Sequence, residues 1–266
     1  MSYATLEIEK IGAIATLWMN RPDLHNAFNA QLIDDLTAAL RTLDDDDAVR
    51  VVVLAGRGKS FSAGGDLNWM KAAGEAGYDA NLADARKLAD MLRQLAEMRK
   101  PTIARVQGAA LGGGMGLAAA CDICVASTQA SFATSEVRFG LIPSTIGPYV
   151  LRAIGARQAL RYFQTAERLS AARAVEIGLA HEVVAPDDLD AKISEIAGAL
   201  LHGAPKAMTA AKELVRDVAG QPVDAALIEE TVRRIAGLRA TPEAKEGLAA
   251  FLEKRPPEWM GQKNVR

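Results

Sequence analysis

The sequence predicts an α/β protein with a buried parallel sheet and a helical C-terminal region. VRVVVLAG, PTIARVQG and DICVAS are apolar runs of the kind found in strands buried on both faces, and a helix-like segment separates the first from the second. Beyond about residue 186, four successive segments carry helical apolar spacing with Gly or Pro between them. With 266 residues, 50% of them hydrophobic, the chain is long enough for one core and a helical appendage. We therefore expect a core over residues 1–190 and a helical region over residues 191–266.

Alternation and helical spacing define the elements in order. LEIEKIG and AIATLWM alternate apolar with polar or small residues around Gly12, which predicts a hairpin. From Asn29 to Leu43, apolar residues recur at steps of three and four, which predicts a helix with Asn29 as its N-cap. Helices between buried strands imply right-handed crossovers, so a site is expected in the loops that follow VVVLAG and TIARVQG.

Composition and charge exclude several kinds of function. Lys and Arg number 31 against 33 Asp and Glu, so no overall positive field attracts nucleic acid. No apolar run approaches the roughly 20 residues that cross a bilayer. MSYATLEIEK lacks the layout of a secretory signal, so we expect a cytoplasmic protein without membrane association. Cys121 and Cys124 are expected as buried thiols, and the three histidines lack ligand spacing, so no metal site is expected.

Two glycine-containing turns, in FSAGGDLNWM and GAALGGGMGLA, each follow a predicted buried strand. They match neither a P-loop, because Val53 stands where that motif needs glycine, nor the dinucleotide pattern G-x-G-x-x-G. Glycine lets a substrate carbonyl approach the main chain, and a helix N-terminus adds unpaired N–H groups. The turns therefore predict a pair of amides that bind an oxyanion, although the same glycines could serve only as tight turns.

Three segments, FSAGGDLNWM, VQGAALGGGMGLAAACDICVAS and ATSEVRFGLIPSTIG, resemble successive motifs of the enoyl-CoA hydratase/isomerase (crotonase) family. The resemblance covers nearly the whole chain, from RPDLHNAFNA to EGLAAFLEKRPPEWM. It implies a crotonase-like spiral of ββα units with a helical C-terminal trimerisation region, assembled as a homotrimer or homohexamer. It also implies an acyl-CoA substrate and no separate cofactor.

The resemblance assigns roles to three residues. Gly65 and Gly113 match the two positions whose amides form the family's oxyanion hole, where fixed donors stabilise charge that develops only in the transition state. Glu136 in SEVRFG matches the family's proton-transferring glutamate. Burial would raise its pKa and let it act as acid and base, whereas an ordinary surface glutamate would sit in a salt bridge.

Substrate contacts are implied in the same way. RPDLHNAFNA resembles the family's CoA-contacting loop, and the turn over residues 63–68 accompanies it beside pantetheine and adenine. A neighbouring subunit is implied to add an aromatic residue and a lysine, although these would also fit an ordinary amphipathic helix. The implied contacts are the backbones of Leu24 and His25, the turn residues Ala63, Asp66, Leu67 and Asn68, and Phe251 and Lys254 of the neighbour.

One position departs from the family's pattern. Many hydratases carry a second glutamate two residues after the glycine triplet, where this chain has Gly116. Syn hydration normally uses both acids, whereas moving a double bond from C3 to C2 needs one, so a Δ3,Δ2-enoyl-CoA isomerase is an alternative. GGGMGL and SEVRFGLIPSTIGPYV nevertheless resemble bacterial methylglutaconyl-CoA and carboxyl-prenyl-CoA hydratases, a branch that also has glycine here.

This second resemblance favours an enoyl-CoA hydratase of fatty acid or branched-chain catabolism. If the acyl chain ends in a carboxylate, Gly116 would leave room for it or for water, and Arg138 could pair with it. Arg138 could equally be a solvated or interface residue. A non-catalytic acyl-CoA-binding protein is the third interpretation, and the presence of Glu136 argues against it.

Overall fold

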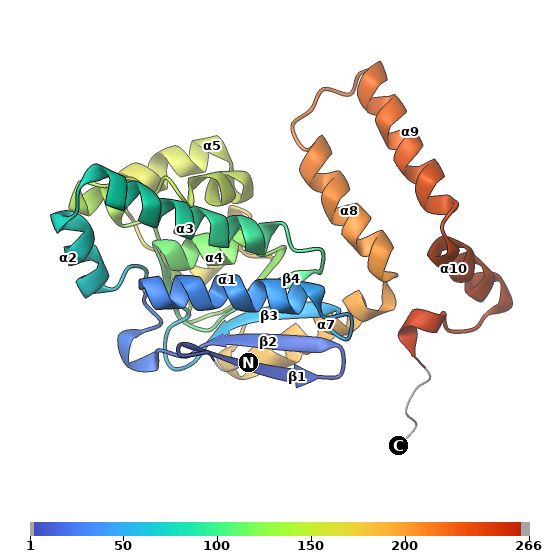
Figure 1. Ribbon diagram of the computed structural model, residues 1–266, viewed down its shortest axis with the longest axis horizontal. Coiled ribbons are helices and arrows are strands. Elements are labelled where there is room, and N and C mark those ends of the chain that lie inside the picture. The colour runs from blue at the N-terminus through green and yellow to red at the C-terminus, as the bar shows by residue number, and fades with distance from the viewer. Residues whose placement is uncertain (1–2, 262–266) are drawn as a thin grey trace.

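A six-stranded, mostly parallel sheet forms the centre of the fold. In the computed structural model, which describes residues 3–261, the strands run in the order β1-β2-β3-β4-β6-β9 (Figure 1). β1 and β2 pair antiparallel, and each later neighbour pairs parallel. The strands are β1 (Leu6–Ile11), β2 (Ile14–Met19), β3 (Val51–Gly56), β4 (Thr102–Val106), β6 (Ile123–Ser127) and β9 (Glu182–Val184).

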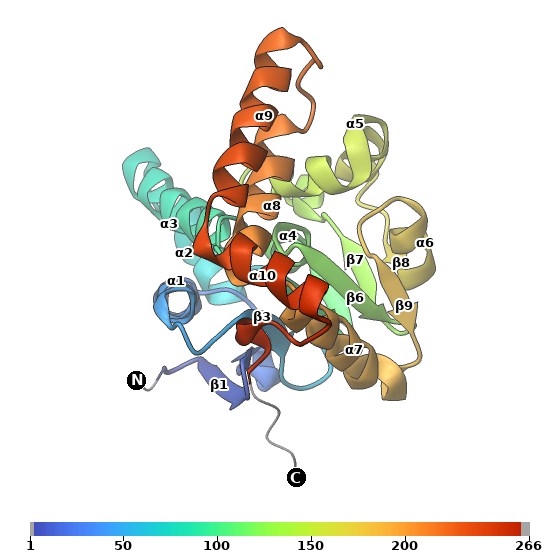
Figure 2. The same cartoon turned by 90° about the vertical axis from the view of Figure 1, so that its right-hand side faces the viewer.

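Helices cover both faces of this sheet (Figure 2). The first begins after Asn29, whose side chain accepts the Leu32 amide at 2.9 Å, and it buries the predicted apolar face. The helices are α1 (Ala30–Asp45), α2 (Leu67–Glu75), α3 (Tyr78–Ala96), α4 (Gly113–Ala120), α5 (Gly147–Thr165), α6 (Ala171–Glu176), α7 (Leu189–His202), α8 (Pro205–Val218), α9 (Ala225–Arg239) and α10 (Pro242–Glu253), with 3-10 turns η1 (Pro22–Leu24), η2 (Glu136–Phe139), η3 (Pro186–Asp188) and η4 (Glu258–Met260).

The strand β3 is buried throughout because its two faces meet different helices. Val52 and Leu54 belong to the main core with α1 and α3, whereas Val51 and Val53 belong to a second cluster with α7. The hairpin also has its predicted form, since Ile11 pairs with Ile14 across the turn. The predicted hairpin, first helix and buried strands are confirmed.

A smaller sheet of β5 (Ala109–Leu111), β7 (Ser131–Ala133) and β8 (Leu169–Ser170) lies beside the first. In the chain, β4 is followed by β5 and β6 is followed by β7, and both of these short strands belong to the second sheet. The elements β4, β5 and α4 thus form one strand–strand–helix unit. Isolated parallel bridges, Ser62 with Ala110 and Phe28 with Gly65, continue this layer into the segment after β3. The small sheet therefore joins the two loops in which a site is expected.

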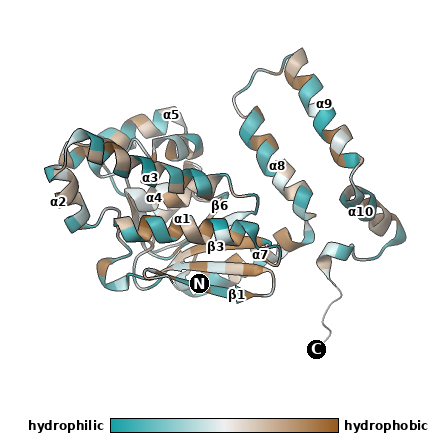
Figure 3. Ribbon diagram, viewed as in Figure 1, coloured by the Kyte–Doolittle hydropathy of each residue, from teal (hydrophilic) through white to brown (hydrophobic). Residues whose placement is uncertain are grey.

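The helices α8, α9 and α10 project from the core (Figures 1 and 2). α7 packs on the sheet through Leu189, Ile193 and Ala197, whereas α8 and α9 bury no residue within this chain. Hydrophobic residues nevertheless recur along these helices (Figure 3). Exposed apolar side chains on them are Val215, Ile228, Val232, Ile235, Leu248, Phe251 and Leu252.

Polar contacts attach this helical region to the core. The guanidinium of Arg50, the residue before β3, donates to the carbonyl oxygens of Gly203 at 2.5 Å and Trp259 at 2.7 Å. Lys212 of α8 pairs with Asp122 at 2.8 Å, just before β6. The region is therefore held by a few directional contacts, and its apolar faces are left exposed.

Candidate active site

The first glycine turn follows β3 and is fixed by the main chain. The amide of Phe28 donates to the carbonyl oxygen of Gly64 at 2.6 Å, and the Asp66 amide donates to that of Phe28 at 2.8 Å. Gly64 has φ +91, a left-handed conformation that favours glycine. Within residues 3–261, the Gly65 amide between these bonds donates to no protein acceptor. This N–H is therefore available to an external carbonyl.

The second glycine turn lies where β5 leads into α4. Gly112 has φ +49, and its amide donates to the carbonyl oxygen of Ala133 at 2.8 Å. Gly113 is the first residue of α4, so its N–H has no acceptor within the helix, and none of the other described residues accepts it. The helix dipole adds a favourable field for negative charge at this end. The second turn thus also offers an unpaired amide.

The backbone ladder joins the two turns directly. The Ser62 amide donates to the carbonyl oxygen of Ala109 at 3.0 Å, and the Leu111 amide donates back to that of Ser62 at 2.9 Å. A Cβ placed on Gly64 would lie 2.9 Å from the Leu111 carbonyl oxygen. The two turns therefore touch, and the spacing of their free amides is set by main-chain bonds.

Glu136, the first residue of η2, lies beside the meeting point of the turns. A Cβ placed on Gly112 would lie 3.1 Å from Glu136 Oε1 and 3.8 Å from the Cα of Gly64. Glu136 Oε2 is buried and has no hydrogen-bond partner among the described residues. Burial raises the pKa of this carboxyl, since desolvation disfavours the charged form. The alternative of a surface glutamate in a salt bridge is wrong, because Glu136 is half-buried and forms no ion pair within residues 3–261.

Packing also requires glycine in the second turn. A Cβ on Gly113 would lie 2.1 Å from Cε2 of the Phe28 ring, and one on Gly114 would lie 2.4 Å from the Ser62 carbonyl oxygen. These glycines thus serve close packing as well as amide exposure. The tight-turn interpretation therefore does not exclude the other one, and oxyanion binding by these amides stays a prediction.

The expectation that Gly116 leaves room for water or an acyl carboxylate is wrong. A Cβ on Gly116 would lie 2.2 Å from Cγ2 and 2.7 Å from Cβ of Ile146, a side chain that is 2% exposed. Ile146 precedes α5 and fills this space with an apolar group. The direction that the second acid's side chain would take is thus occupied by the packed Ile146 side chain.

Arg138 shares η2 with Glu136, but its guanidinium donates to the carbonyl oxygen of Ala166 at 3.0 Å. Ala166 ends α5 in a left-handed conformation, so this bond satisfies a helix-terminal carbonyl. Arg138 therefore connects η2 to the end of α5. Arg138 is also exposed, so the solvated arginine weighed from the sequence is compatible with this contact, and its pairing with a substrate carboxylate stays a prediction.

The predicted CoA-contacting loop is tied to the first glycine turn. Arg21 pairs with Asp66 at 2.9 Å, with both side chains largely buried, and also donates to the Ala27 carbonyl. Burial opposes ionisation of Asp66, but the Arg21 bond and the backbone bonds outweigh it and lower the pKa of Asp66. Its Oδ1 also accepts the Asn68 amide at 2.9 Å and caps α2. Asp66 and Asn68 thus position the turn.

The remaining predicted loop residues differ in exposure. The Ala63 amide donates to the His25 carbonyl oxygen at 2.9 Å, and the His25 ring lies 3.0 Å from the Ser60 hydroxyl. Leu24 is 51% exposed and Leu67 is 82% exposed, so both offer apolar surface at the rim of the turns. The predicted pantetheine contacts therefore lie together along one edge of the site.

Asn26 and Ser62 were missed by the sequence analysis. Asn26 is fully buried at φ +54, and its amide donates to the carbonyl oxygens of Arg57 and Ser60, each at 2.9 Å. The Ser62 hydroxyl donates to the Asn26 carbonyl oxygen at 2.8 Å. Asparagine tolerates the left-handed conformation better than most residues, which is the signal that could have identified Asn26.

Phe251 and Lys254 lie away from the other predicted residues within one chain. Phe251 is 80% exposed on α10, at the end of the projecting helical region, and Lys254 ends that helix at φ +57. The structure of one chain does not bring them to Glu136. Their predicted role in a neighbouring subunit stays a prediction.

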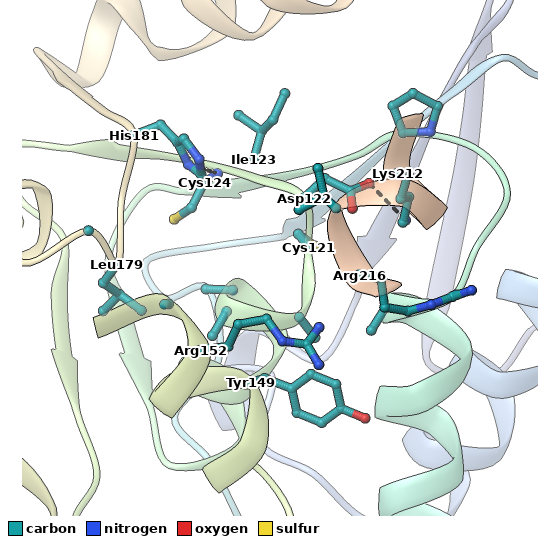
Figure 4. Close-up of a pocket in the computed structure, with 18 of the residues that line it drawn as sticks. Cys121, Asp122, Ile123, Cys124, Tyr149, Arg152, Leu179, His181, Lys212 and Arg216 are labelled. Atoms are coloured by element: carbon teal, nitrogen blue, oxygen red, sulfur yellow. Dashed lines mark hydrogen bonds and ion pairs between the residues drawn. The ribbon is translucent and has the colours of Figure 1, made fainter. Parts of the chain in front are cut away.

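A pocket of about 760 Å³ lies elsewhere, between the core and α8 (Figure 4). Tyr149 and Arg152 of α5 line one side, and the Asp122–Lys212 pair lies across from them. Neither glycine turn nor Glu136 lines it. Cys121 and Cys124 at its wall are buried, as predicted, and burial raises their thiol pKa values, to about 12 for Cys124.

No group of three or more His, Cys, Asp or Glu side chains in residues 3–261 is arranged to hold a metal ion. No described helix is long and apolar enough to cross a membrane.

Fold and site together define a class of protein. Two joined backbone turns present unpaired amides, and one partly buried acid lies beside them in a spiral of strand–strand–helix units. This arrangement suits chemistry in which a carbonyl oxygen gains negative charge while a neighbouring carbon exchanges a proton.

The chain belongs to the enoyl-CoA hydratase/isomerase family, whose profile matches residues 9–262. It is 34% identical to the crotonyl-CoA hydratase of Syntrophomonas wolfei, covering 98% of this chain and 100% of that protein. It is 32% identical to the trans-2-decenoyl-[acyl-carrier-protein] isomerase of Streptococcus mutans, covering 94% and 95%. It matches the crystal structure of an enoyl-CoA hydratase from Shewanella pealeana with a TM-score of 0.93, 41% identity and 96% coverage of each chain. The predicted enzyme family and crotonase-like α/β fold are confirmed.

Proposed function

We propose that the protein is an enoyl-CoA hydratase, which adds water across the α,β double bond of an unsaturated acyl-CoA thioester. The observation that carries this proposal is the unpartnered, buried Oε2 of Glu136 beside two turns whose amides are free. Family membership and the hydratase names of relatives support it. The proposed substrate brings its own coenzyme A, and the proposed reaction needs no further cofactor.

In the proposed reaction, the Gly65 and Gly113 amides donate to the thioester oxygen. The carbonyl becomes enolate-like when hydroxide adds to the β-carbon, so these donors act most strongly in the transition state. The Glu136 carboxylate takes the proton of the attacking water and then protonates the α-carbon. A raised pKa suits both halves of this exchange, because the group must gain and lose a proton in one cycle.

A Δ3,Δ2-enoyl-CoA isomerase is the second candidate. Its support is the absence of an acid at Gly116 and a relative named as an isomerase in Streptococcus mutans. Glu136 alone would move the proton between the two carbons. An assay of crotonyl-CoA and 3-enoyl-CoA with product identification separates the two, since hydration yields a saturated hydroxy product and isomerisation a conjugated one. Turnover of 3-enoyl-CoA alone would reject the hydratase.

The acyl group is best tested with a branched and carboxylated thioester beside a simple one. The local likeness to methylglutaconyl-CoA and carboxyl-prenyl-CoA hydratases supports including methylglutaconyl-CoA. Ile146 fills the direction of a side chain at Gly116, and one guanidinium nitrogen of Arg138 is already bonded to the Ala166 carbonyl oxygen. We therefore expect crotonyl-CoA to be hydrated at least as fast as methylglutaconyl-CoA, and the reverse order would restore the carboxylated substrate.

A non-catalytic acyl-CoA-binding protein is the third candidate. A non-catalytic binding protein and an enzyme would both bind crotonyl-CoA, so a calorimetric measurement of binding does not separate the two functions. Turnover does: binding without any product from the thioester panel would favour the binding protein and reject both enzymes.

We also propose that residues 191–266 assemble the chain into a homotrimer or homohexamer, with residues 1–190 as the catalytic core. The exposed apolar faces of α9 and α10 support this, because a monomer rarely exposes so many apolar groups in one region. Phe251 and Lys254 would then reach the coenzyme A of a neighbour. Native mass spectrometry gives the subunit count, and a monomer that turns over substrate would reject the assembly. The cytoplasmic location stays a prediction.

A further inference from the structure

The proposed reaction does not explain why residue 116, on α4, is glycine. Gly116 lies one helical turn after Gly112, and its amide donates to the Gly112 carbonyl oxygen at 3.1 Å. The direction that a side chain would take from Gly116 is occupied by Ile146, at 2.2 Å for Cγ2 and 2.7 Å for Cβ. Real Cβ atoms essentially never lie within 3.0 Å of such neighbours. Residues 116 and 146 therefore share one side-chain volume.

Ile146 has little freedom to move away from a side chain at residue 116. Its side chain is 2% exposed and belongs to the main core cluster that also contains Met115 and Val150. The Val150 amide bonds to the Ile146 carbonyl oxygen at 3.1 Å and begins α5, so the backbone is fixed by a helix start. A packed core transmits such an overlap as strain, which lowers the stability of the folded state.

We infer that Ile146 is a specificity-determining residue that keeps α4 from carrying a second acid beside Glu136. This inference rests on the proposed function for its chemical meaning, whereas its steric part stands alone. While Ile146 fills the shared volume, residue 116 must be glycine, and Glu136 receives no carboxylate partner from α4. The chain is thereby restricted to reactions that one catalytic carboxylate can complete. The number of catalytic carboxylates is thus determined by residue 146 as much as by residue 116.

The steric part is tested by thermal unfolding of Gly116→Ala with Gly198→Ala as its matched control. Both glycines lie inside helices, but a Cβ on Gly198 would meet nothing within 4 Å. Alanine favours helix at either position. We expect Gly116→Ala to lower Tm by at least about 4 °C and Gly198→Ala to leave it level or raise it. Equal Tm values for the two variants would overturn the inference.

Rescue at residue 146 identifies the colliding atoms. Ile146→Val keeps both close atoms, Ile146→Ala keeps Cβ at 2.7 Å, and Ile146→Gly removes both. The Tm loss caused by Gly116→Ala should persist in the valine background, shrink in the alanine background and disappear in the glycine background. If the glycine background does not fold, the valine and alanine backgrounds decide the matter, and an equal loss in both refutes the shared volume.

The chemical part is tested with Gly116→Glu in the Ile146→Gly or Ile146→Ala background, whichever folds. We expect the ratio of crotonyl-CoA hydration to 3-enoyl-CoA isomerisation to rise at least about tenfold over the same background without the glutamate. An unchanged ratio overturns the role of Ile146 in limiting the number of catalytic carboxylates, even if the side chains of residues 116 and 146 do compete for one volume. Absence of turnover in the parent protein rejects the proposed function instead, and the Tm comparison still decides the shared volume.

Discussion

Replacing Glu136 with glutamine keeps the side chain's size and removes its proton exchange. Its Oε2 is buried without a partner beside the turn that holds Gly113, whereas Asp66 in the neighbouring turn is paired with Arg21. We expect Glu136→Gln to lower kcat by about 10²–10⁴-fold, the usual contribution of a positioned acid or base. KM should change little, since the proposed donors to the thioester, the Gly65 and Gly113 amides, are main-chain groups.

The assay follows loss of the conjugated double bond in crotonyl-CoA, and calorimetry with the same thioester measures binding. Glu167→Gln is the matched control, because Glu167 is an exposed partner of Arg161. It should keep parental kcat. Full activity in Glu136→Gln would refute the acid/base assignment, and equal losses in both variants would indicate a general effect of removing a carboxylate.

The same pair predicts opposite effects of pH on stability. Burial raises the pKa of Glu136, so its ionisation penalises the folded state, and the penalty grows as pH rises from the unfolded value of about 4.3 through the folded pKa. The hydrogen bond from Arg161 lowers the pKa of Glu167 to about 2, so its stabilisation is present above about pH 4.3 and is lost on acidification. Glu136→Gln should therefore raise Tm near about pH 8 and not near about pH 4, whereas Glu167→Gln should not raise it at either pH. A fall in Tm for Glu136→Gln at about pH 8 would show that its carboxylate is stabilised after all.

Three further perturbations test the surroundings of the site. Gly113→Ala should lower both Tm and kcat, because its Cβ would lie 2.1 Å from the Phe28 ring; unfolding and turnover that match the parent would contradict the close packing. Asp66→Asn leaves Arg21 without its charge partner and should cost about 3 kcal/mol near neutral pH, measured by urea unfolding. This loss should vanish as the parent is acidified below about pH 3.9 through the lowered folded pKa of Asp66, and a loss independent of pH would contradict the ion pair. Arg50→Met should speed hydrogen exchange in the α7–α8 turn and η4, and unchanged protection there would show that other contacts hold the helical region.

Much of the fold follows from the sequence because apolar patterning determines which faces are buried. The continuous apolar run of β3 predicted a strand buried on both faces, and the three- and four-residue steps of α1 predicted its single apolar face. The projecting helices were also foreseen as helices. Their placement relative to the core was not, because it depends on contacts such as Arg50 with Trp259, which are 209 residues apart in the chain.

The candidate site was predicted in part. Glycine runs and one glutamate can be identified by type and order, and the structure brings Gly112, Gly64 and Glu136 within a few ångströms. The content of the space at Gly116 could not be read from the sequence, since glycine indicates only that a side chain is missing. Whether solvent, substrate or Ile146 fills that space depends on a segment 30 residues later in the chain.

The ladder between Ser62 and the strand β5 has a consequence for how relatives of this protein can diverge. Because hydrogen bonds of the peptide groups fix the separation of the two free amides, side chains farther out can be exchanged without altering where these proposed donors lie. Relatives can therefore change the residues around the turns, and with them the acyl group accepted in the proposed reaction, while the two donors keep their spacing.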